Sequence, residues 1–399
     1  MSKIDELIRK HCPDGVEYKT LDEVLDYEQP TKYIVQSTDY DDSFAVPVLT
    51  AGQTFILGYT DETGGIYKAN KDNPTIIFDD FTTSFHWVDF DFKVKSSAMK
   101  MLRPKTKTIN FRYVYYAMCC IRFVPQDHTR HWISKYSLFT IPVPPLPVQE
   151  EIVRILDNFT ELEKELEKEL EKRRQQYEYY RNKLLSFNEI GGGIAQQVKW
   201  MKMSDIFHIK NGYTPSKANP EYWTNGTIPW FRMEDIRANG RVLSDSIQHI
   251  TPEAVKGGKL FPANSIIVAT TATIGEHALI IADSLANQRF TFLTKRESLI
   301  PELDMKYMFY YMFIVDEWCK NNTNISGFAS VDMGKFKNYL VPIPPIAEQK
   351  RIVAILDKFD SLVNDISVGL PAEIEARRKQ YEYYRNRLLT FKRLNLKTA

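Results

Sequence analysis

Two long stretches of this chain carry apolar side chains at a helical period. The first runs from about Val148 to Phe187, with apolar positions at Ile152, Ile155, Phe159, Leu162, Leu166, Leu170, Tyr177, Tyr180 and Leu184. The second follows Pro345, with apolar positions at Ile352, Ile355, Phe359, Leu362, Ile366, Leu370, Ile374, Tyr381, Tyr384 and Leu388. Spacings of three and four residues predict a helix with one apolar stripe. About forty helical residues make a rod roughly 60 Å long, so we expect the two stripes to bury each other in an antiparallel coiled coil.

The two helical stretches are copies of each other. Residues 141–145 (IPVPP) return as residues 341–345 (VPIPP), and residues 173–187 return as residues 377–391 with 12 of 15 positions identical. The offset between the copies changes from 200 to 204, so the second copy contains four extra residues, and Pro371 lies among them. Because proline removes a helical hydrogen bond, we predict that the second helix kinks or restarts near Pro371.

The rest of the chain has a mixed pattern. Short runs at 46–49, 54–57 and 75–78 are rich in β-branched or other apolar residues and are separated by glycines and turn residues, which predicts short strands and many loops. A helix is expected at Ser2–His11, with Ser2 as its N-cap, and another at Phe111–Arg122. These elements predict a globular α+β region before the first long helix.

The pattern then repeats to give a two-headed molecule. Val198–Ile206 parallels Val16–Val24, Pro142–Pro147 reads as an extended connector, and Gly191–Gly193 reads as a flexible joint. We therefore predict an α+β fold with a pseudo-two-fold repeat, in which two globular heads are joined by two long helices. The expected segments are 1–140 and 191–340 for the heads, and 141–190 and 341–399 for the helical spacers.

Charge limits how such a protein can bind nucleic acid. The net charge is +1, and the four segments from the N-terminus carry −2, −3, +2 and +4. A protein that binds DNA on its own normally has a strongly basic face. Phosphate neutralisation is therefore expected from local basic clusters or from a partner subunit.

Other sequence features argue against a membrane protein and against an enzyme. The most apolar run, Tyr113–Cys120, is short and is ended by Arg122, and no signal-peptide core follows Met1, so we expect a cytoplasmic protein. The four cysteines form no CxxC pair; Cys119 and Cys120 are expected to be buried in an apolar helix, and no metal site is expected. The chain has no P-loop, no glycine-rich cofactor turn and no Asn-Pro-Pro-Tyr or Asp-Pro-Pro-Tyr methylation motif, so neither a cofactor nor catalysis is expected.

The duplicated motif resembles that of the specificity subunits of Type I restriction-modification systems. Its first part, Pro-x-Pro-Pro-(x)3-Gln-(x)2-Ile-Val-x-Ile-Leu-Asp-x-Phe, occupies 142–159 and 342–359. Its second part, Tyr-Glu-Tyr-Tyr-Arg-Asn-(Lys/Arg)-Leu-Leu-x-Phe, occupies 177–187 and 381–391. The second head adds family-like words that the first head mostly lacks: Gly212-Tyr-Thr-Pro-Ser216, Ile228-Pro-Trp230, Ile250-Thr-Pro-Glu-Ala254, Phe261-Pro262, Ala272-Thr-Ile-Gly275 and Asn287-Gln-Arg289. The resemblance covers nearly the whole chain.

This resemblance implies a non-catalytic subunit that recognises double-stranded DNA. Each head would be a target-recognition domain for one half of a bipartite site, and the helical pair would fix the gap between the halves. Two methyltransferase (M) subunits and restriction/translocase (R) subunits would supply the chemistry. S-adenosylmethionine, magnesium and ATP would then be used by those partners.

Candidate DNA contacts are polar and basic residues in the loops of the heads, because arginine, lysine, asparagine and glutamine read base edges while hydroxyls and cations hold phosphates. The competing interpretation for each is ordinary solvated loop chemistry. In the second head the candidates are Lys210, Asn211, Tyr213, Thr214, Lys217, Arg232, Thr271 and Arg289, with Asn287 and Gln288 expected to order a turn. In the first head they are Thr82, Thr83, Ser84, Lys100, Arg130 and His131, the last also readable as a structural histidine.

Clustered tyrosines near the end of each rod are candidates for binding a partner. Three tyrosines in four positions cover more than one helical face, so some must point away from the other rod. The alternative is that those on the stripe only fill the helix interface. The candidates are Tyr177, Tyr180, Arg181, Tyr381, Tyr384 and Arg385.

Two other functions fit parts of the pattern. A coiled-coil scaffold or an anti-restriction protein would explain the rods but not two elaborate, unlike heads. The specificity subunit of a combined cleavage and methylation (Type IIB-like) system would explain both. An enzyme is disfavoured because neither the histidines nor acidic pairs such as Asp41-Asp42 and Asp79-Asp80 have recognisable catalytic partners.

Overall fold

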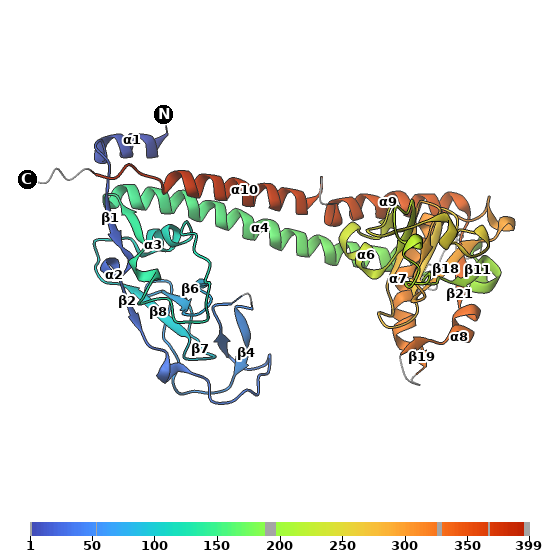
Figure 1. The fold of residues 1–399 in the computed structure, drawn as a ribbon, viewed down its shortest axis with the longest axis horizontal. Coiled ribbons are helices and arrows are strands. Elements are labelled where there is room, and N and C mark those ends of the chain that lie inside the picture. The colour runs from blue at the N-terminus through green and yellow to red at the C-terminus, as the bar shows by residue number, and fades with distance from the viewer. Residues whose placement is uncertain (1, 53, 188–196, 325–328, 366–367, 395–399) are drawn as a thin grey trace, which may run out of the picture. The chain divides into compact units, whose positions relative to one another are not determined.

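The computed structural model describes residues 2–52, 54–187, 197–324, 329–365 and 368–394 (Figure 1). The chain forms two compact units, one of residues 1–167 with 373–399 and the other of residues 168–372. Each unit contains one head together with part of each of the two helical stretches. The predicted joint at Gly191–Gly193 lies outside the described residues.

The first head is built from two small sheets and one main helix. A four-stranded sheet has the order β2-β8-β5-β6 and a three-stranded sheet the order β4-β3-β7, while β1 pairs with β9. The capping box at Ser2 begins α1 as predicted. The elements are α1 (Lys3–His11), β1 (Glu17–Thr20), α2 (Leu21–Val24), β2 (Leu25–Glu28), β3 (Val46–Leu49), β4 (Ile56–Thr60), β5 (Thr75–Asp79), β6 (Phe85–Val88), β7 (Lys93–Val94), β8 (Met99–Pro104), α3 (Phe111–Met118) and β9 (Thr140–Val143), with one-turn 3-10 helices at Thr31–Tyr33 and Tyr136–Leu138.

The second head has the same plan with insertions. Its larger sheet has the order β11-β18-β15-β16-β13 and its smaller sheet the order β14-β12-β17, while β10 pairs with β21 and β19 with β20. The elements are β10 (Lys199–Lys202), α5 (Met203–Ile206), β11 (Phe207–Asn211), β12 (Ile228–Phe231), α6 (Met233–Asn239), β13 (Val242–Leu243), β14 (His249–Ile250), β15 (Ser265–Ala269), β16 (His277–Ile280), β17 (Leu285–Ala286), β18 (Phe290–Lys295), α7 (Met305–Asn321), β19 (Thr323–Asn324), β20 (Ser330–Val331), α8 (Met333–Asn338) and β21 (Leu340–Ile343). One-turn 3-10 helices lie at Pro220–Tyr222, Pro252–Ala254, Lys256–Gly258 and Glu297–Leu299.

The long helices confirm the predicted antiparallel packing within each unit. In the first unit, α4 (Leu146–Leu185) packs with α10 (Leu370–Leu388): Phe159 stacks on Tyr384 with centroids 5.5 Å apart, and Arg378 donates to Glu163 and Glu167 at 2.5 and 2.7 Å. In the second unit, α4 packs with α9 (Ile346–Asn364). The ring centroid of Phe359 lies 6.3 Å from that of Tyr177 and 5.6 Å from that of Tyr180.

The second helical stretch is interrupted. The helix α9 ends at Asn364 and α10 begins at Leu370, so Pro371 lies in the first turn of a new helix, where a missing N–H costs nothing. The prediction of a kink or restart near Pro371 is thus met by a restart. Two smaller boundaries were misjudged: Pro147 lies inside the first turn of α4, and α3 ends at Met118, so Cys119 and Cys120 follow the helix and are half-buried.

Candidate nucleic-acid interface and partner surfaces

A cavity of about 270 Å³ in the second head brings together four of its eight predicted DNA contacts. Thr214 and Lys217 come from the loop after β11, Arg232 from the end of β12, and Arg289 from the loop between β17 and β18. Trp230, Met233, Glu234, Asn287 and Gln288 complete its lining. Three cations against one carboxylate make this hollow suitable for a phosphate or for the acceptor edge of a base.

The cavity is held open by a fixed frame. The Trp230 indole donates to the Tyr213 carbonyl at 3.0 Å, and the Asn287 side chain accepts from the Arg289 amide at 3.0 Å, as expected of a turn-ordering residue. The Thr214 hydroxyl is hydrogen bonded to Gln288, which ties two of the loops together. The Nε atom of Arg232 is buried without a hydrogen-bond partner among the described residues. A carboxylate oxygen of Glu234 lies 3.9 Å from this Nε atom, beyond hydrogen-bond distance, so a nucleic-acid ligand would supply the acceptor that this nitrogen lacks.

The other predicted residues of the second head lie around this cavity or apart from it. Lys210 and Asn211 are exposed at the end of β11, where Asn211 accepts from the Thr291 hydroxyl at 2.9 Å. Tyr213 is structural, because its hydroxyl accepts from the Lys256 amide at 2.7 Å. Thr271 follows β15 and forms a bridge with Ser330.

In the first head, the predicted residues cluster at the loop after β5. Thr82 is exposed, its hydroxyl lies 2.6 Å from that of Ser84, and Arg130 is exposed over the ring of Phe81. Phe81 stacks on His128 at 4.6 Å. This small exposed group of hydroxyls, an arginine and stacked rings can hold a DNA backbone.

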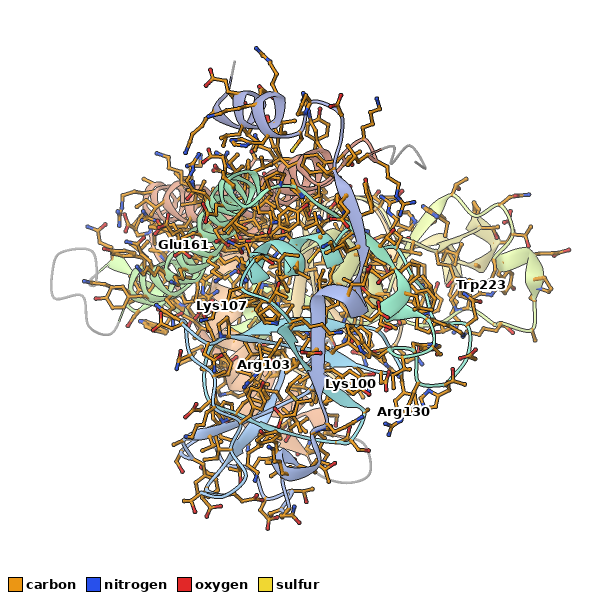
Figure 2. All side chains as sticks on the ribbon, turned by 90° about the vertical axis from the view of Figure 1, so that its left-hand side faces the viewer. Lys100, Arg103, Lys107, Arg130, Glu161 and Trp223 are labelled. Atoms are coloured by element: carbon orange, nitrogen blue, oxygen red, sulfur yellow. The ribbon has the colours of Figure 1, made fainter. Side chains whose placement is uncertain are left out.

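Three predicted residues of the first head are buried, which corrects their assignment. Lys100, labelled in Figure 2 together with Arg130, is 1% exposed and forms an ion pair with Asp80 at 3.2 Å. His131 is fully buried. Thr83 is also buried, and its backbone φ is 59°. Asp80 also accepts from the Trp132 amide at 2.7 Å. Such groups present no surface to a ligand. They fix the two loops that carry Thr82 and Arg130, and sequence alone could not separate them from exposed loop residues.

The duplicated motif locks each head onto its helix with the same contacts. Asp157 accepts from the Tyr116 hydroxyl at 2.5 Å and from Arg112 at 2.9 Å; Asp357 accepts from Tyr310 at 2.5 Å and from Lys306 at 2.9 Å. The motif glutamines repeat this agreement: Gln149 and Gln349 each donate to a proline carbonyl at 2.7 Å, and each accepts a backbone amide from the head. The motif therefore attaches each head to its helix by the same contacts, and we call each of these two attachments, at Asp157 and at Asp357, a joint.

The predicted partner residues divide into buried and exposed groups. Tyr177 is 5% exposed and packs on Phe359 of α9, and Tyr381 is half-buried and packs on Tyr116 of α3, so both fill the core of their units, which is the alternative that the sequence left open. Tyr180 and Tyr384 are 39% and 36% exposed. Arg181 and Arg385 lie over the rings of Tyr177 and Tyr381 at 5.3 and 5.4 Å. Tyr179 and Tyr383, at 59% and 58%, are the most exposed tyrosines of the repeat and were missing from the candidate residues.

Each unit also contains the same groove beside its head. In the first unit a cavity of about 410 Å³ is lined by Tyr18, Cys120, Phe139, Thr140, Leu389 and Thr390, among others. In the second unit a cavity of about 880 Å³ is lined by the corresponding Trp200, Ile314, Tyr339, Leu340, Leu185 and Ser186, among others. Tyr18 and Trp200 correspond because each lies opposite the motif proline of its strand pair, Pro142 or Pro342.

Neither a metal site nor a membrane span is found in the part of the chain that the structure describes. None of its His, Cys, Asp and Glu residues gather in groups of three or more suited to a metal ion. No described helix has the length and apolarity needed to cross a bilayer.

The two heads have similar sheet orders, and each is attached to a long helix by the same set of contacts. The family model of the Type I restriction modification DNA specificity domain matches residues 13–172 and 196–376. The chain belongs to this family, and its function is DNA recognition without catalysis.

Two relatives are similar to this chain, one over nearly the full length and one over about half of it. The chain is 45% identical to the Type I restriction enzyme EcoR124I/EcoR124II specificity subunit of Escherichia coli, across 98% of this chain and 97% of that one. It is 54% identical to the EcoprrI specificity subunit of Escherichia coli over 49% of this chain and 51% of that protein. These matches favour the DNA-recognition function over the scaffold, anti-restriction and combined-system alternatives.

Solved structures support the fold. One match is a chain from a structural study of the complex assembly and conformational transition of the type I R-M system. The chain superposes on it with a TM-score of 0.59 and 16% identity, covering 94% of this chain and 98% of that one. It superposes with a TM-score of 0.53 and 15% identity on the S subunit of a Type-I restriction-modification system from M. genitalium, covering 94% and 96%.

Proposed function

We propose that each head reads one half of a bipartite double-stranded DNA target and that the long helices set the gap between the halves. The observation that carries this proposal is the pair of equivalent joints at Asp157 and Asp357, which attach two heads of the same topology to the same helical element. Equivalent attachment with unlike loops suits a protein that presents two different readers in one fixed way.

The second head supplies the more complete reading site. Lys217, Arg232 and Arg289 converge on one cavity from three loops, and an arginine can bind the O6 and N7 atoms of guanine with two parallel hydrogen bonds. The first head offers Thr82 and Ser84 in the loop after β5, and Arg130 from another loop lies over Phe81 beside them.

The chain would act together with catalytic partners. We infer two methyltransferase subunits, because the groove beside each head occurs twice with corresponding residues, including Tyr18 in one copy and Trp200 in the other. Exposed Tyr179 and Tyr383 would extend these two surfaces along the helices. Restriction/translocase subunits would complete the complex. S-adenosylmethionine, magnesium and ATP would be bound by these partners and not by this chain.

The test is long-read methylome sequencing of a methylation-free host that expresses this chain with its methyltransferase partner. The expected result is one methyladenine motif made of two specific blocks around a gap of fixed length. A continuous motif without a gap, or no new methylation although the two proteins copurify, would contradict the proposal.

A further inference from the structure

The two heads can be aligned by backbone contacts although their loop sequences differ. The small parallel strand pairs agree in register: Val48 and Leu49 face Lys93 and Val94 in the first head, and Trp230 and Phe231 face Leu285 and Ala286 in the second. The third strand of each small sheet is antiparallel to the first member of the pair, as β4 is to β3 and β14 is to β12. The smaller sheets therefore provide a common reference frame.

Three backbone hydrogen bonds in each head show which loops correspond. The Leu49 carbonyl accepts from the Lys95 amide at 3.1 Å, as the Phe231 carbonyl accepts from Asn287 at 3.1 Å. In this alignment Lys95 takes the place of Asn287.

The neighbouring loops agree as well. The Val94 carbonyl accepts from Val35 at 3.0 Å, as the Ala286 carbonyl accepts from Tyr213 at 2.9 Å. The Ala98 carbonyl accepts from the Asp80 amide at 2.9 Å, and the Arg289 carbonyl accepts from Thr270 at 3.0 Å. The loop Lys95–Ala98 of the first head thus corresponds to the loop Asn287–Arg289, which lines the basic cavity of the second head.

We propose that Lys95, with Ser96 and Ser97, is a DNA-contacting element of the first head, in the loop that corresponds to the loop Asn287–Arg289 of the second head. This inference rests on the proposed function and names a site that the motifs of the sequence do not reveal. All three side chains are exposed. One ammonium and two hydroxyls at a loop tip are groups that bind phosphates, and the ammonium can also reach a guanine edge.

The surroundings of Lys95 suit this role. Its Nζ atom lies 3.3 Å from the Tyr40 hydroxyl and 5.7 Å from the centre of that ring, so no carboxylate neutralises it in the described structure. The loop that carries Tyr40 is anchored at its start, because Glu62 accepts from the amides of Gln36 and Ser37 at 2.8 and 2.9 Å.

The proposed element also adjoins the exposed group that the sequence did predict. The bond from the Asp80 amide to Ala98 joins the Lys95 loop to the loop of Thr82. The exposed residues Lys95, Ser96 and Thr82 therefore lie on neighbouring loops, at the end of β5 where β8 begins.

The test compares Lys95→Gln with Lys71→Gln in the chain assembled with its methyltransferase. Lys71 is an exposed lysine of the same head in the turn before β5, at the opposite end of that strand from the Lys95 loop. Binding is measured against duplexes that carry the motif found by methylome sequencing, with either the first or the second half scrambled, at several salt concentrations.

We expect Lys95→Gln to weaken binding to the intact target by roughly tenfold, and Lys71→Gln to leave it unchanged. A loss confined to duplexes with an intact first half indicates a base contact. A uniform loss with a salt slope reduced by about one indicates a phosphate contact. Both results support the site, and Lys95→Arg should restore binding in either case.

Unchanged binding by Lys95→Gln, or a loss accompanied by a lower thermal unfolding midpoint, would overturn the inference. Both outcomes leave the wild-type methylation motif intact, so they are distinct from failure of the proposed function. That failure would appear as the absence of a bipartite motif for the wild-type chain.

Discussion

At the scale of single residues, burial separates the groups that can meet DNA from those that build the loops. Arg289, Lys217 and Arg130 are exposed, whereas Lys100 and His131 are not. A sequence shows residue types but not which loop residue turns inward. The types of residue at the DNA-binding site could therefore be predicted, but only some of the individual residues could be. The buried pair of Lys100 and Asp80 could not be inferred, because its partners are twenty residues apart, one in β8 and the other in the turn after β5.

The basic cavity of the second head predicts a sequence-specific loss. Replacing Arg289 by alanine should weaken binding to the intact target about 10- to 100-fold, since a bidentate arginine contact with a base is worth roughly 1–3 kcal/mol. Competition binding with duplexes scrambled in one half measures this effect. Lys259→Ala, at an exposed lysine before β15, is the control and should bind normally. An Arg289→Ala protein with unaltered affinity would exclude the cavity from DNA binding.

Glu151 makes a second prediction, about acid stability. Hydrogen bonds from Arg154 lower the pKa of Glu151 to about 2. Burial opposes this shift, and a further hydrogen bond from Lys3 adds to it. A depressed carboxyl pKa stabilises the fold above the unfolded pKa of about 4.5 and loses that effect as the pH falls toward 2.

Thermal unfolding at several pH values tests this. The midpoint of Glu151→Gln should lie below that of the wild type at pH 6, and the difference should shrink between pH 4.5 and 2. Glu150→Gln removes an exposed neighbour and should behave as wild type at every pH. A constant difference across the range would show that the carboxylate charge is not the cause.

At the scale of elements, the sequence repeat predicted the long helices well and the strands of the heads poorly. An N-cap located α1, and the apolar period located α4 and both parts of the second helical stretch, because these signals are local in the sequence. The heads depend on short strands such as β7 and β17, of two residues each, whose pairing is set by distant partners rather than by local pattern. Their shared topology therefore became visible only in three dimensions.

The repeated joint predicts equal losses at corresponding positions. Tyr116→Phe and Tyr310→Phe each remove one hydroxyl that donates to the motif aspartate at 2.5 Å. A hydrogen bond to a charged group contributes about 1.5–3 kcal/mol, so each variant should lower the free energy of unfolding by a similar amount in that range. Denaturant titration of the two proteins measures this. A large loss in one and none in the other would refute the equivalence of the two joints.

At the scale of the whole molecule, duplication gives the chain two places for each kind of interaction. Each unit has a head, a joint and a groove, and the corresponding residues share roles even where they differ in type, as Tyr18 and Trp200 do. On the proposed function, one chain thus presents two unlike DNA readers and two similar surfaces for methyltransferase subunits.

The paired grooves predict a change in stoichiometry. Native mass spectrometry of the wild-type chain with its methyltransferase should give two copies of the partner. Trp200→Ala should remove bulk from one groove, where this indole is 44% exposed, and should shift the population toward one copy. Trp223→Ala, in the head but outside the groove, should retain two. Full occupancy of both sites by Trp200→Ala would separate the groove from partner binding.

The central claim, that two heads read two half-sites independently, is tested most directly by exchanging one head. Residues 196–340 are replaced by the corresponding region of another family member, and the methylome of a host expressing this chain with its methyltransferase is compared with that of the wild type. Our account predicts that one block of the methylation motif changes while the other block remains. A change in both blocks, or an unaltered motif, would contradict it.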